Sequence, residues 1–308
     1  LWEYIINRTR KMKWNFVFMA ETLDGGVPGY RSNRHFDILN ENLVFRFTQE
    51  KINQSWQLRQ ALEDRRNAYS GGAVLLNLTG HDEVMPDNDP WVVASRYGAV
   101  SAVDGLPMLF YGQEWGIGLF NPADPDNPND GFLHSHELNF GKYIPHFKQW
   151  NKLTVWEQPP AFSDGLAQWH GRVNWARLNS PALQSQNRYF LNKVGGGEEG
   201  SIFAVAKYQT AYAAPATSDV VLAFALFLRH GEAHFSAAAT FDLQGPWSLL
   251  GLDTGKTYRV RNLASSDASA YIASGWPRSG QDLFNNGIYV QLGGGTLGPS
   301  ITADGQLV

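Results

Sequence analysis

Three stretches of the sequence are almost wholly apolar, and each is followed by a charged or amide group. They are residues 14–20, 73–79 and 106–111. Runs without polar alternation are typical of parallel strands that are buried on both faces. A weaker run at residues 35–39 predicts a fourth strand. The pattern therefore favours a parallel sheet whose strands end at polar groups.

Helical patterns separate most of these strands. We expect helices at residues 1–12, 54–69, 90–104 and 166–179. The third begins with Pro90 in its first turn and stops before Gly105, as helices commonly do. Residues 22–34, between the first two strands, have no helical pattern, so we expect the crossover there to be reduced to a turn. This alternation of strands and helices predicts a parallel α/β architecture.

The pattern changes after about residue 183, where short apolar segments are separated by Gly, Pro, Asp and Ser. The segments are residues 201–208, 219–228, 239–243, 257–263 and 287–292. Short strands with turn residues between them predict an antiparallel all-β domain. The chain therefore divides into residues 1–182, the α/β part, and residues 183–308, an antiparallel β-sandwich.

Composition narrows the classes of partner. Hydrophobic residues make up 43% of the 308 residues, which is enough for a sizeable core. The net charge of −4 is mild and the Lys and Arg residues are scattered, so we expect neither a nucleic-acid nor a membrane partner. The sequence has no Cys, which excludes disulfides and thiolate chemistry. Its 11 Trp residues suit core packing and also the stacking of sugar rings.

Acidic residues follow three of the predicted parallel strands: Glu21, Asp82 and Glu114. In a parallel barrel the C-terminal strand ends meet at one edge, where functional residues collect. One such acid could equally be a salt-bridged surface group, but three in register favour a site. Glycosidic bond cleavage needs paired carboxylates, one to protonate the leaving oxygen and one to attack or stabilise the oxocarbenium-like centre. His81, beside Asp82, adds a hydrogen-bonding group for sugar hydroxyls.

Five segments resemble motifs of the α-amylase superfamily, glycoside hydrolase family 13, and occur in the same order. They are residues 18–21, 36–39, 80–82, 105–114 and 176–183, which resemble the fifth to eighth barrel strands and the end of the last barrel helix. The match at 105–114 (GLPMLFYGQE) is the most specific. The resemblance implies a fold class of α/β type: the second half of a (β/α)8 TIM barrel followed by an antiparallel all-β C-terminal domain.

The resemblance also implies roles for individual residues. Glu21 corresponds to the general acid/base, and Asp82 to the transition-state stabiliser that holds hydroxyls of the sugar at the cleavage point. His81 would hydrogen-bond the same sugar. Gly80 stands where the family usually has Asn, so that contact is absent. Further substrate-binding candidates beside the eighth strand are Tyr111, Gln113 and Trp115.

The family's nucleophile is an Asp at the end of the fourth strand, which would lie upstream of Leu1. No substitute is evident, because Asp24 follows Glu21 too closely to come from another strand and Asp37 lies within the predicted sixth strand. We therefore expect a fragment, a cleaved product or one chain of a split enzyme, inactive alone, whose partner is a complementary N-terminal half-barrel chain. Any calcium ligands would come mostly from that half, and no metal ligand or cofactor is identifiable in this chain.

The expected function is that of a retaining α-glucan hydrolase that cleaves α-1,4-glucosidic bonds within starch or maltooligosaccharides. A transglycosylase of the same superfamily, such as a glucanotransferase, would use the same covalent intermediate and remains an alternative. A non-catalytic α-glucan-binding subunit is a second alternative. A starch-type substrate would imply a secreted, cell-surface or periplasmic location.

Overall fold

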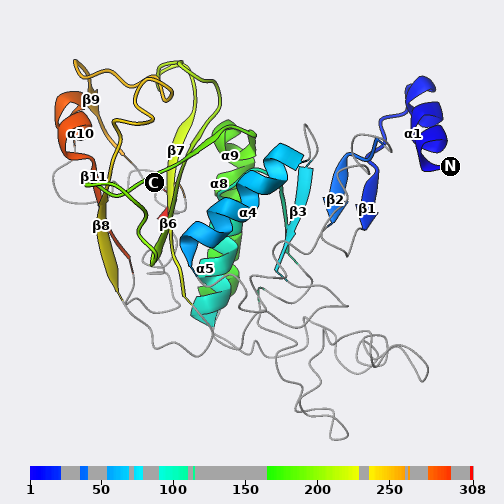
Figure 1. Ribbon diagram of the computed structural model, residues 1–308, viewed down its shortest axis with the longest axis horizontal. Helices are drawn as coiled ribbons and strands as arrows, with labels where there is room; N and C mark the ends of the chain where they lie inside the picture. The colour runs from blue at the N-terminus through cyan, green and yellow to red at the C-terminus, as the bar shows by residue number, and fades with distance from the viewer. Residues whose placement is uncertain are drawn as a thin grey trace, which may run out of the picture.

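The computed structural model describes the chain in several ranges, and the longest gap between them follows the fourth parallel strand, at residues 115–164. The described residues are 1–21, 35–40, 54–68, 73–78, 90–109, 114, 165–228, 236–260, 263, 277–292 and 306–307. Within them, parallel strands and antiparallel strands lie on opposite sides of a layer of helices (Figure 1).

Four short strands form the parallel sheet. They are β1 (Met19–Glu21), β2 (Ile38–Asn40), β3 (Ala73–Asn77) and β4 (Leu106–Met108). Their order in the sheet is the order in the sequence, and each neighbouring pair is parallel. The predicted succession of four parallel strands is therefore confirmed, although each strand is shorter than the apolar run that predicted it.

The four predicted helices are also present. They are α1 (Trp2–Lys11), α4 (Ser55–Ala68), α5 (Pro90–Ser101) and α8 (Gly165–Asn179), and the short α9 (Pro181–Gln184) follows α8. Buried residues of α4, α5 and α8 share one apolar core with the parallel sheet. None of the described helices is long and apolar enough to cross a lipid bilayer.

Antiparallel strands make up the later part of the chain. A four-stranded sheet has the order β12-β7-β6-β5, formed by Gln306–Leu307, Val220–Leu226, Ile202–Tyr208 and Arg188–Phe190. Two further pairs are β8 (Ala237–Phe241) with β11 (Ile288–Leu292), and β9 (Thr257–Tyr258) with β10 (Arg278–Ser279), which leads into α10 (Gly280–Asn286). The sequence predicted β6, β7, β8, β9 and β11, whereas β5, β10 and β12 have only two or three residues and give too little pattern to be predicted.

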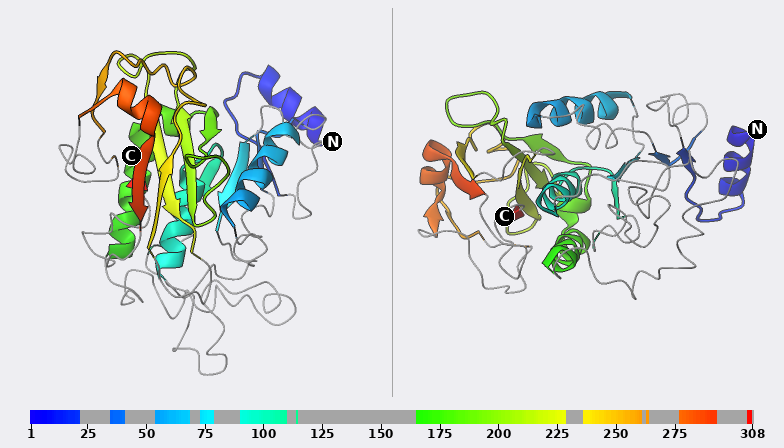
Figure 2. Two further views of the ribbon diagram at one scale, coloured as in Figure 1. Left: turned by 60° about the vertical axis from the view of Figure 1, so that its left-hand side comes forward. Right: turned by 90° about the horizontal axis from the view of Figure 1, so that it is seen from below.

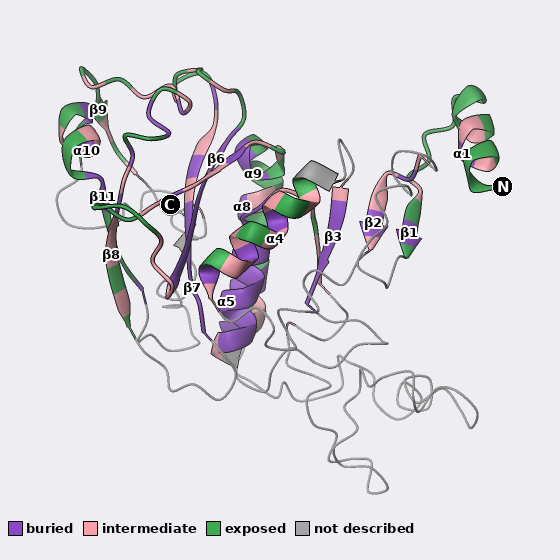
Figure 3. Cartoon of the chain, in the orientation of Figure 1, coloured by how far each residue is buried: buried purple, intermediate pink, exposed green. Residues whose placement is uncertain are grey.

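Strand β6 is an inner strand of the four-stranded antiparallel sheet, and all seven of its residues are buried. Phe203 and Val205 belong to the core that contains α5 and α8, whereas Ala204 and Ala206 belong to a second core with β8 and β11. Figures 2 and 3 show the helices between the two sets of strands, with α5 buried along most of its length. The antiparallel sheet is therefore covered on both faces.

The prediction that residues 14–20 form one strand buried on both faces is wrong. Strand β1 begins only at Met19, and its burial pattern is exposed, buried, exposed. The side chains of Trp14, Phe16 and Val17 are all more than half exposed. The physical reason is that β1 is the edge strand of the sheet, and among the described residues nothing covers its outer edge or its outer face.

Asp37 was expected inside a strand, but the structure places it directly before β2. Its carboxylate accepts hydrogen bonds from Arg10 Nη2 at 2.6 Å and from the backbone N–H of Phe18 at 3.0 Å. Arg10 lies on α1, so these bonds tie the first helix to the start of the sheet. Asp37 therefore has a structural role. This agrees with the expectation that it is not the nucleophile.

Candidate functional site

Three polar side chains end the first three parallel strands. Glu21 is the last residue of β1, Asn40 of β2 and Asn77 of β3. Glu21 and Asn40 are directly paired in the register of the two strands. Paired residues of neighbouring strands point to the same face of a sheet, and the strands lie about 4.8 Å apart. The carboxyl group of Glu21 and the amide of Asn40 are therefore neighbours at the C-terminal edge.

The two faces of the parallel sheet differ in how they are covered. One face carries Ala20, Leu39, Val74 and Leu76, which are all buried in the core formed with the helices. Side chains alternate along a strand, so Glu21, Asn40 and Asn77 belong to the other face. There the strands are exposed at β1 and partly covered at β2 and β4, whereas Leu75 and Asn77 of β3 are buried. The polar edge thus borders the open face.

The described part of the chain contains only one of the two predicted catalytic residues. Glu21 lies on the open face and is exposed. Asp82 lies outside the described residues. So do the predicted substrate-binding residues His81, Tyr111, Gln113 and Trp115. The distance between the two proposed catalytic carboxyl groups, and the role of each residue in this group, therefore stay predictions.

Asn40 and Asn77 are site-edge residues that the sequence analysis did not single out. The predicted strands ran to residue 79 and stopped at residue 39, so neither Asn was placed at a strand end. Asn77 is almost fully buried, at 5% exposure. Amide groups both donate and accept hydrogen bonds, as sugar hydroxyls do. A search for amide as well as acidic residues at strand ends would have found both.

Glu114, which follows the fourth strand, is partly buried. Its Oε2 atom is buried without a hydrogen-bond partner. Burial raises the pKa of Tyr97 on α5, and the charge of Glu114 raises it further. The hydroxyl of Tyr97 donates to Asn174 Oδ1 at 2.6 Å, and its ring lies 4.5 Å from that of His170. Glu114 therefore lies near Tyr97 of α5.

A partly buried arginine contacts the turn that leads into β4. Arg177 on α8 donates to the carbonyl oxygens of Ser101 at 2.6 Å, Val103 at 3.0 Å and Gly105 at 2.7 Å. These are carbonyls at and just beyond the end of α5, which a helix leaves without internal partners. Burial lowers the pKa of Arg177 to about 10, so it stays protonated at neutral pH. Arg177 thereby sets where β4 begins.

Gly105 is required by the same turn. Its φ of +130° is one that side-chain-bearing residues rarely adopt, and a Cβ there would lie 2.8 Å from the carbonyl oxygen of Val74. The close approach aligns β4 with β3, where Leu106 pairs with Leu75. This gives a physical reason for the glycine that opens the 105–114 segment.

Metal ligands do not gather in the described ranges. No group of three or more His, Asp or Glu side chains lies close enough there to hold a metal ion.

Comparisons with known proteins bear on the fold. No protein-family model and no curated protein sequence matches this chain. The solved structure of a noncanonic maltogenic α-amylase from Thermotoga neapolitana is similar over 99% of this chain and 55% of its own, with a TM-score of 0.56 and 12% sequence identity. An α-amylase from Anoxybacillus is similar over the same shares, with a TM-score of 0.57 and 14% identity. The chain shares its fold with α-amylases.

The likeness covers both the parallel and the antiparallel parts of the chain. AmyP in complex with maltose is similar over 99% of this chain and 60% of its own, with a TM-score of 0.58 and 12% identity. The chain thus spans little more than half the length of the α-amylases that it resembles. This share agrees with the resemblance of the sequence motifs to the C-terminal half of an α-amylase.

Proposed function

We propose that this chain is the C-terminal half of an α-amylase-type glycoside hydrolase that cleaves α-1,4-glucosidic bonds within α-glucans with retention of configuration. Residues 1–182 form the second half of its (β/α)8 barrel, and residues 183–308 form its antiparallel C-terminal domain. The other half of the barrel supplies the Asp nucleophile and covers the open face of the parallel sheet. Among solved proteins with this fold, AmyP binds maltose and maltotriose and an α-amylase from Geobacillus thermoleovorans binds acarbose, which supports an α-glucan substrate.

One observation carries the proposal: Glu21 ends β1 on the face of the sheet that the helices leave open. In a closed barrel that face becomes the interior, and its C-terminal edge becomes the mouth at which barrel enzymes hold their catalytic residues. A carboxylic acid at this mouth can protonate the glycosidic oxygen and later accept a proton from water. Asp82 acts with it as the stabiliser of the sugar, and His81, Tyr111, Gln113 and Trp115 contact the substrate.

The apolar residues of the open face support a partner half. Met19 on β1 and Leu106 on β4 are exposed at 53% and 40%. A barrel interior is filled by layers of such side chains. An uncovered apolar face with an open strand edge favours aggregation, so a second half-barrel that covers both is the stable arrangement. A starch-sized substrate places the assembled enzyme outside the cytoplasm, in secreted, cell-surface or periplasmic form.

The test is the Glu21→Gln variant in a preparation that contains the whole barrel. Turnover of maltooligosaccharides should fall by a factor of roughly 10² to 10⁴, the usual contribution of a general acid or base. Glu3→Gln on α1, the same chemical change at an exposed carboxylate, should leave turnover unchanged. Full activity of Glu21→Gln would overturn the assignment of the acid. The products distinguish the two reaction types, since a glucanotransferase lengthens maltooligosaccharides and a hydrolase only shortens them.

A further inference from the structure

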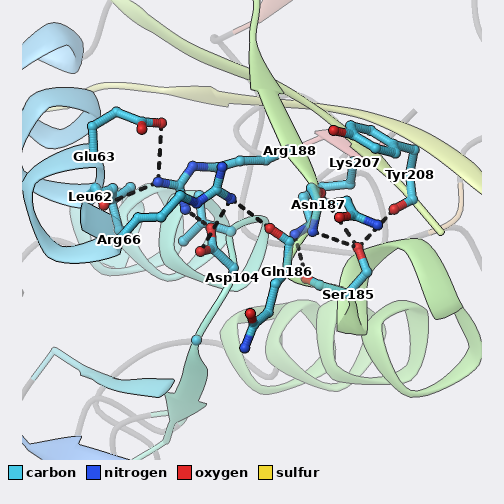
Figure 4. A network of polar contacts seen from close by, with 12 residues as sticks. Leu62, Glu63, Arg66, Asp104, Ser185, Gln186, Asn187, Arg188, Lys207 and Tyr208 are labelled. Carbon is cyan, nitrogen blue, oxygen red and sulfur yellow. Dashed lines mark hydrogen bonds and ion pairs between the residues drawn. The ribbon is translucent and has the colours of Figure 1, made fainter. Parts of the chain in front are cut away.

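The buried cations at the junction of the two sheets have partners within the chain. Arg188 Nη1 pairs with Asp104, and its Nη2 donates to Glu63 Oε1 at 3.1 Å. Lys207 on β6 is fully buried, and its Nζ donates to the carbonyl oxygen of Ser185 at 2.7 Å. Figure 4 shows these contacts. This network therefore holds the fold together and does not need a ligand.

A larger cavity, of about 320 Å³, lies within the antiparallel part of the chain. Its walls come from β7, from the segment between β8 and β9, from β9 and the residues after it, and from α10 and β11. Glu21 lies on the parallel sheet, so this cavity is separate from the candidate active site. Its volume is in the range of pockets that bind small molecules.

The cavity lies where the second core packs less closely against the start of β7. Phe224 and Leu226, toward the end of the strand, are buried in that core. Val220 and Leu222 point to the same face, because side chains alternate along a strand. They are only partly buried, and both line the cavity. The core therefore leaves space over the first half of β7.

Aliphatic side chains form most of the wall of the cavity. Six of them are Val220, Leu222, Leu243, Leu250, Leu283 and Ile288. The hydroxyl of Tyr258, which also lines the cavity, donates to the backbone oxygen of Asp253 at 3.3 Å and accepts from its N–H at 2.8 Å. Apolar walls of this kind hold apolar groups in preference to water. A sugar, with hydroxyl groups on all sides, would find too few hydrogen-bond partners here.

Asp219 supplies a hydrogen-bond acceptor in the wall of the cavity. Its Oδ2 accepts from the hydroxyl of Ser180 at 2.5 Å and from the backbone N–H of Ala182 at 3.0 Å. Both of these bonds go to Oδ2, which leaves Oδ1 to accept a hydrogen bond from a ligand. A carboxylate oxygen is a strong acceptor for a hydroxyl group.

The charges in the wall favour an uncharged ligand. Arg259 lines the cavity together with Asp219 and is exposed. The negative charge of Asp219 repels an anion, and the positive charge of Arg259 repels a cation. A hydroxyl group can donate to Asp219 without either repulsion.

We propose that the cavity binds a small uncharged alcohol. Its apolar body, aromatic or aliphatic, packs against the leucines and valines of the wall, and its hydroxyl donates to Asp219 Oδ1. The apolar body provides most of the affinity, because it leaves water for an apolar surface. The hydrogen bond to Asp219 distinguishes the alcohol from the corresponding hydrocarbon.

Isothermal titration calorimetry of the full chain with benzyl alcohol tests the proposal. One molecule should bind, and toluene, which lacks the hydroxyl, should bind about fivefold more weakly or less tightly still. Val220→Phe fills the cavity and should abolish binding, whereas Val194→Phe, the same change at an exposed valine, should retain it. Absent binding, or binding unchanged in Val220→Phe, overturns the proposal. Tighter binding of benzoate or benzylamine overturns the choice of an uncharged ligand.

Crystals soaked in 4-bromobenzyl alcohol give a second readout that needs no variant. The anomalous signal of bromine should lie inside the cavity, with the hydroxyl oxygen within hydrogen-bonding distance of Asp219 Oδ1. An empty cavity in crystals that hold the probe elsewhere overturns the proposal. Neither test depends on glucan hydrolysis, so each outcome stands apart from the proposed function.

Discussion

The antiparallel and parallel sheets of this chain are covered to very different degrees. All seven residues of β6 are buried, between α5 and α8 on one face and β8 and β11 on the other. Only the middle one of the three residues of β1 is buried. Among the described residues, the antiparallel sheet is covered on both faces, whereas the other face of the parallel sheet is exposed at Met19, Glu21 and Leu106. The difference indicates that the open face of the parallel sheet is an interface.

The strongest test of this comparison is to replace one large side chain in each sheet by alanine. Phe224 on β7 is 2% exposed, and its ring lies 5.1 Å from that of Phe241. Phe224→Ala should lower the free energy of unfolding by about 3–5 kcal/mol, because it leaves a cavity in a closed core. Met19→Ala on the open face should change it by less than about 0.5 kcal/mol. Urea unfolding measures both, and equal losses would contradict the comparison.

The helix-facing side of the parallel sheet should nevertheless be tightly constrained. In Gly105→Ala the new Cβ would lie 2.8 Å from the carbonyl oxygen of Val74, at a φ of +130°. We expect a loss of about 2 kcal/mol or more, from backbone strain and steric contact together. Gly195→Ala is the control, since its φ is +91° but its Cβ would meet no atom within 4 Å. It should cost about 1 kcal/mol by urea unfolding. A smaller loss for Gly105→Ala than for Gly195→Ala would show that this face is not tightly packed.

Buried Lys207 predicts a pH dependence for the antiparallel part. Burial lowers its pKa from 10.5 to about 6 in the folded chain. Between these values the unfolded chain binds a proton that the folded chain does not, so stability rises as pH rises from about 6 toward 10.5. The slope contributed is at most about 1.4 kcal/mol per pH unit. Lys207→Met should flatten the profile of unfolding free energy from pH 6 to 9, while Lys193→Met, at an exposed lysine, should not. An unchanged slope in Lys207→Met would mean that Lys207 is charged in the fold.

The smallest expected effect is at the connection between the two parts. Ser180 caps α9 by accepting from the backbone N–H of Leu183 at 3.1 Å, and its hydroxyl donates to Asp219 Oδ2 at 2.5 Å. Ser180→Ala should lower the unfolding free energy by about 1 kcal/mol, the usual value of an N-cap. The exposed Ser248 provides the matched control, and Ser248→Ala should have almost no effect. Similar urea midpoints for Ser180→Ala and the unmodified chain would show that this cap does not stabilise the fold.

The comparison also explains what could be predicted from the sequence. Continuous apolar runs identified the parallel strands, and helical periodicity placed four helices close to their observed bounds. The run at 14–20 led to the wrong prediction of a strand buried on both faces. An apolar segment looks the same in the sequence whether the residues that cover it lie in this chain or outside it. The ion pairs of Arg188 could not be foreseen, since Glu63, Asp104 and Arg188 come from distant segments and no local pattern links them. Asn77 was missed because the strand was predicted to run two residues too far.

The central claim is that further polypeptide covers the open face of the parallel sheet and completes the site of Glu21. Native mass spectrometry of the protein from its natural source, beside its denatured mass, tests this claim most directly. The account predicts a particle much heavier than the 34.4 kDa of these residues, with the additional mass in a second polypeptide or in a longer chain that contains this one. A particle of 34.4 kDa, or a simple multiple of it, would contradict the account.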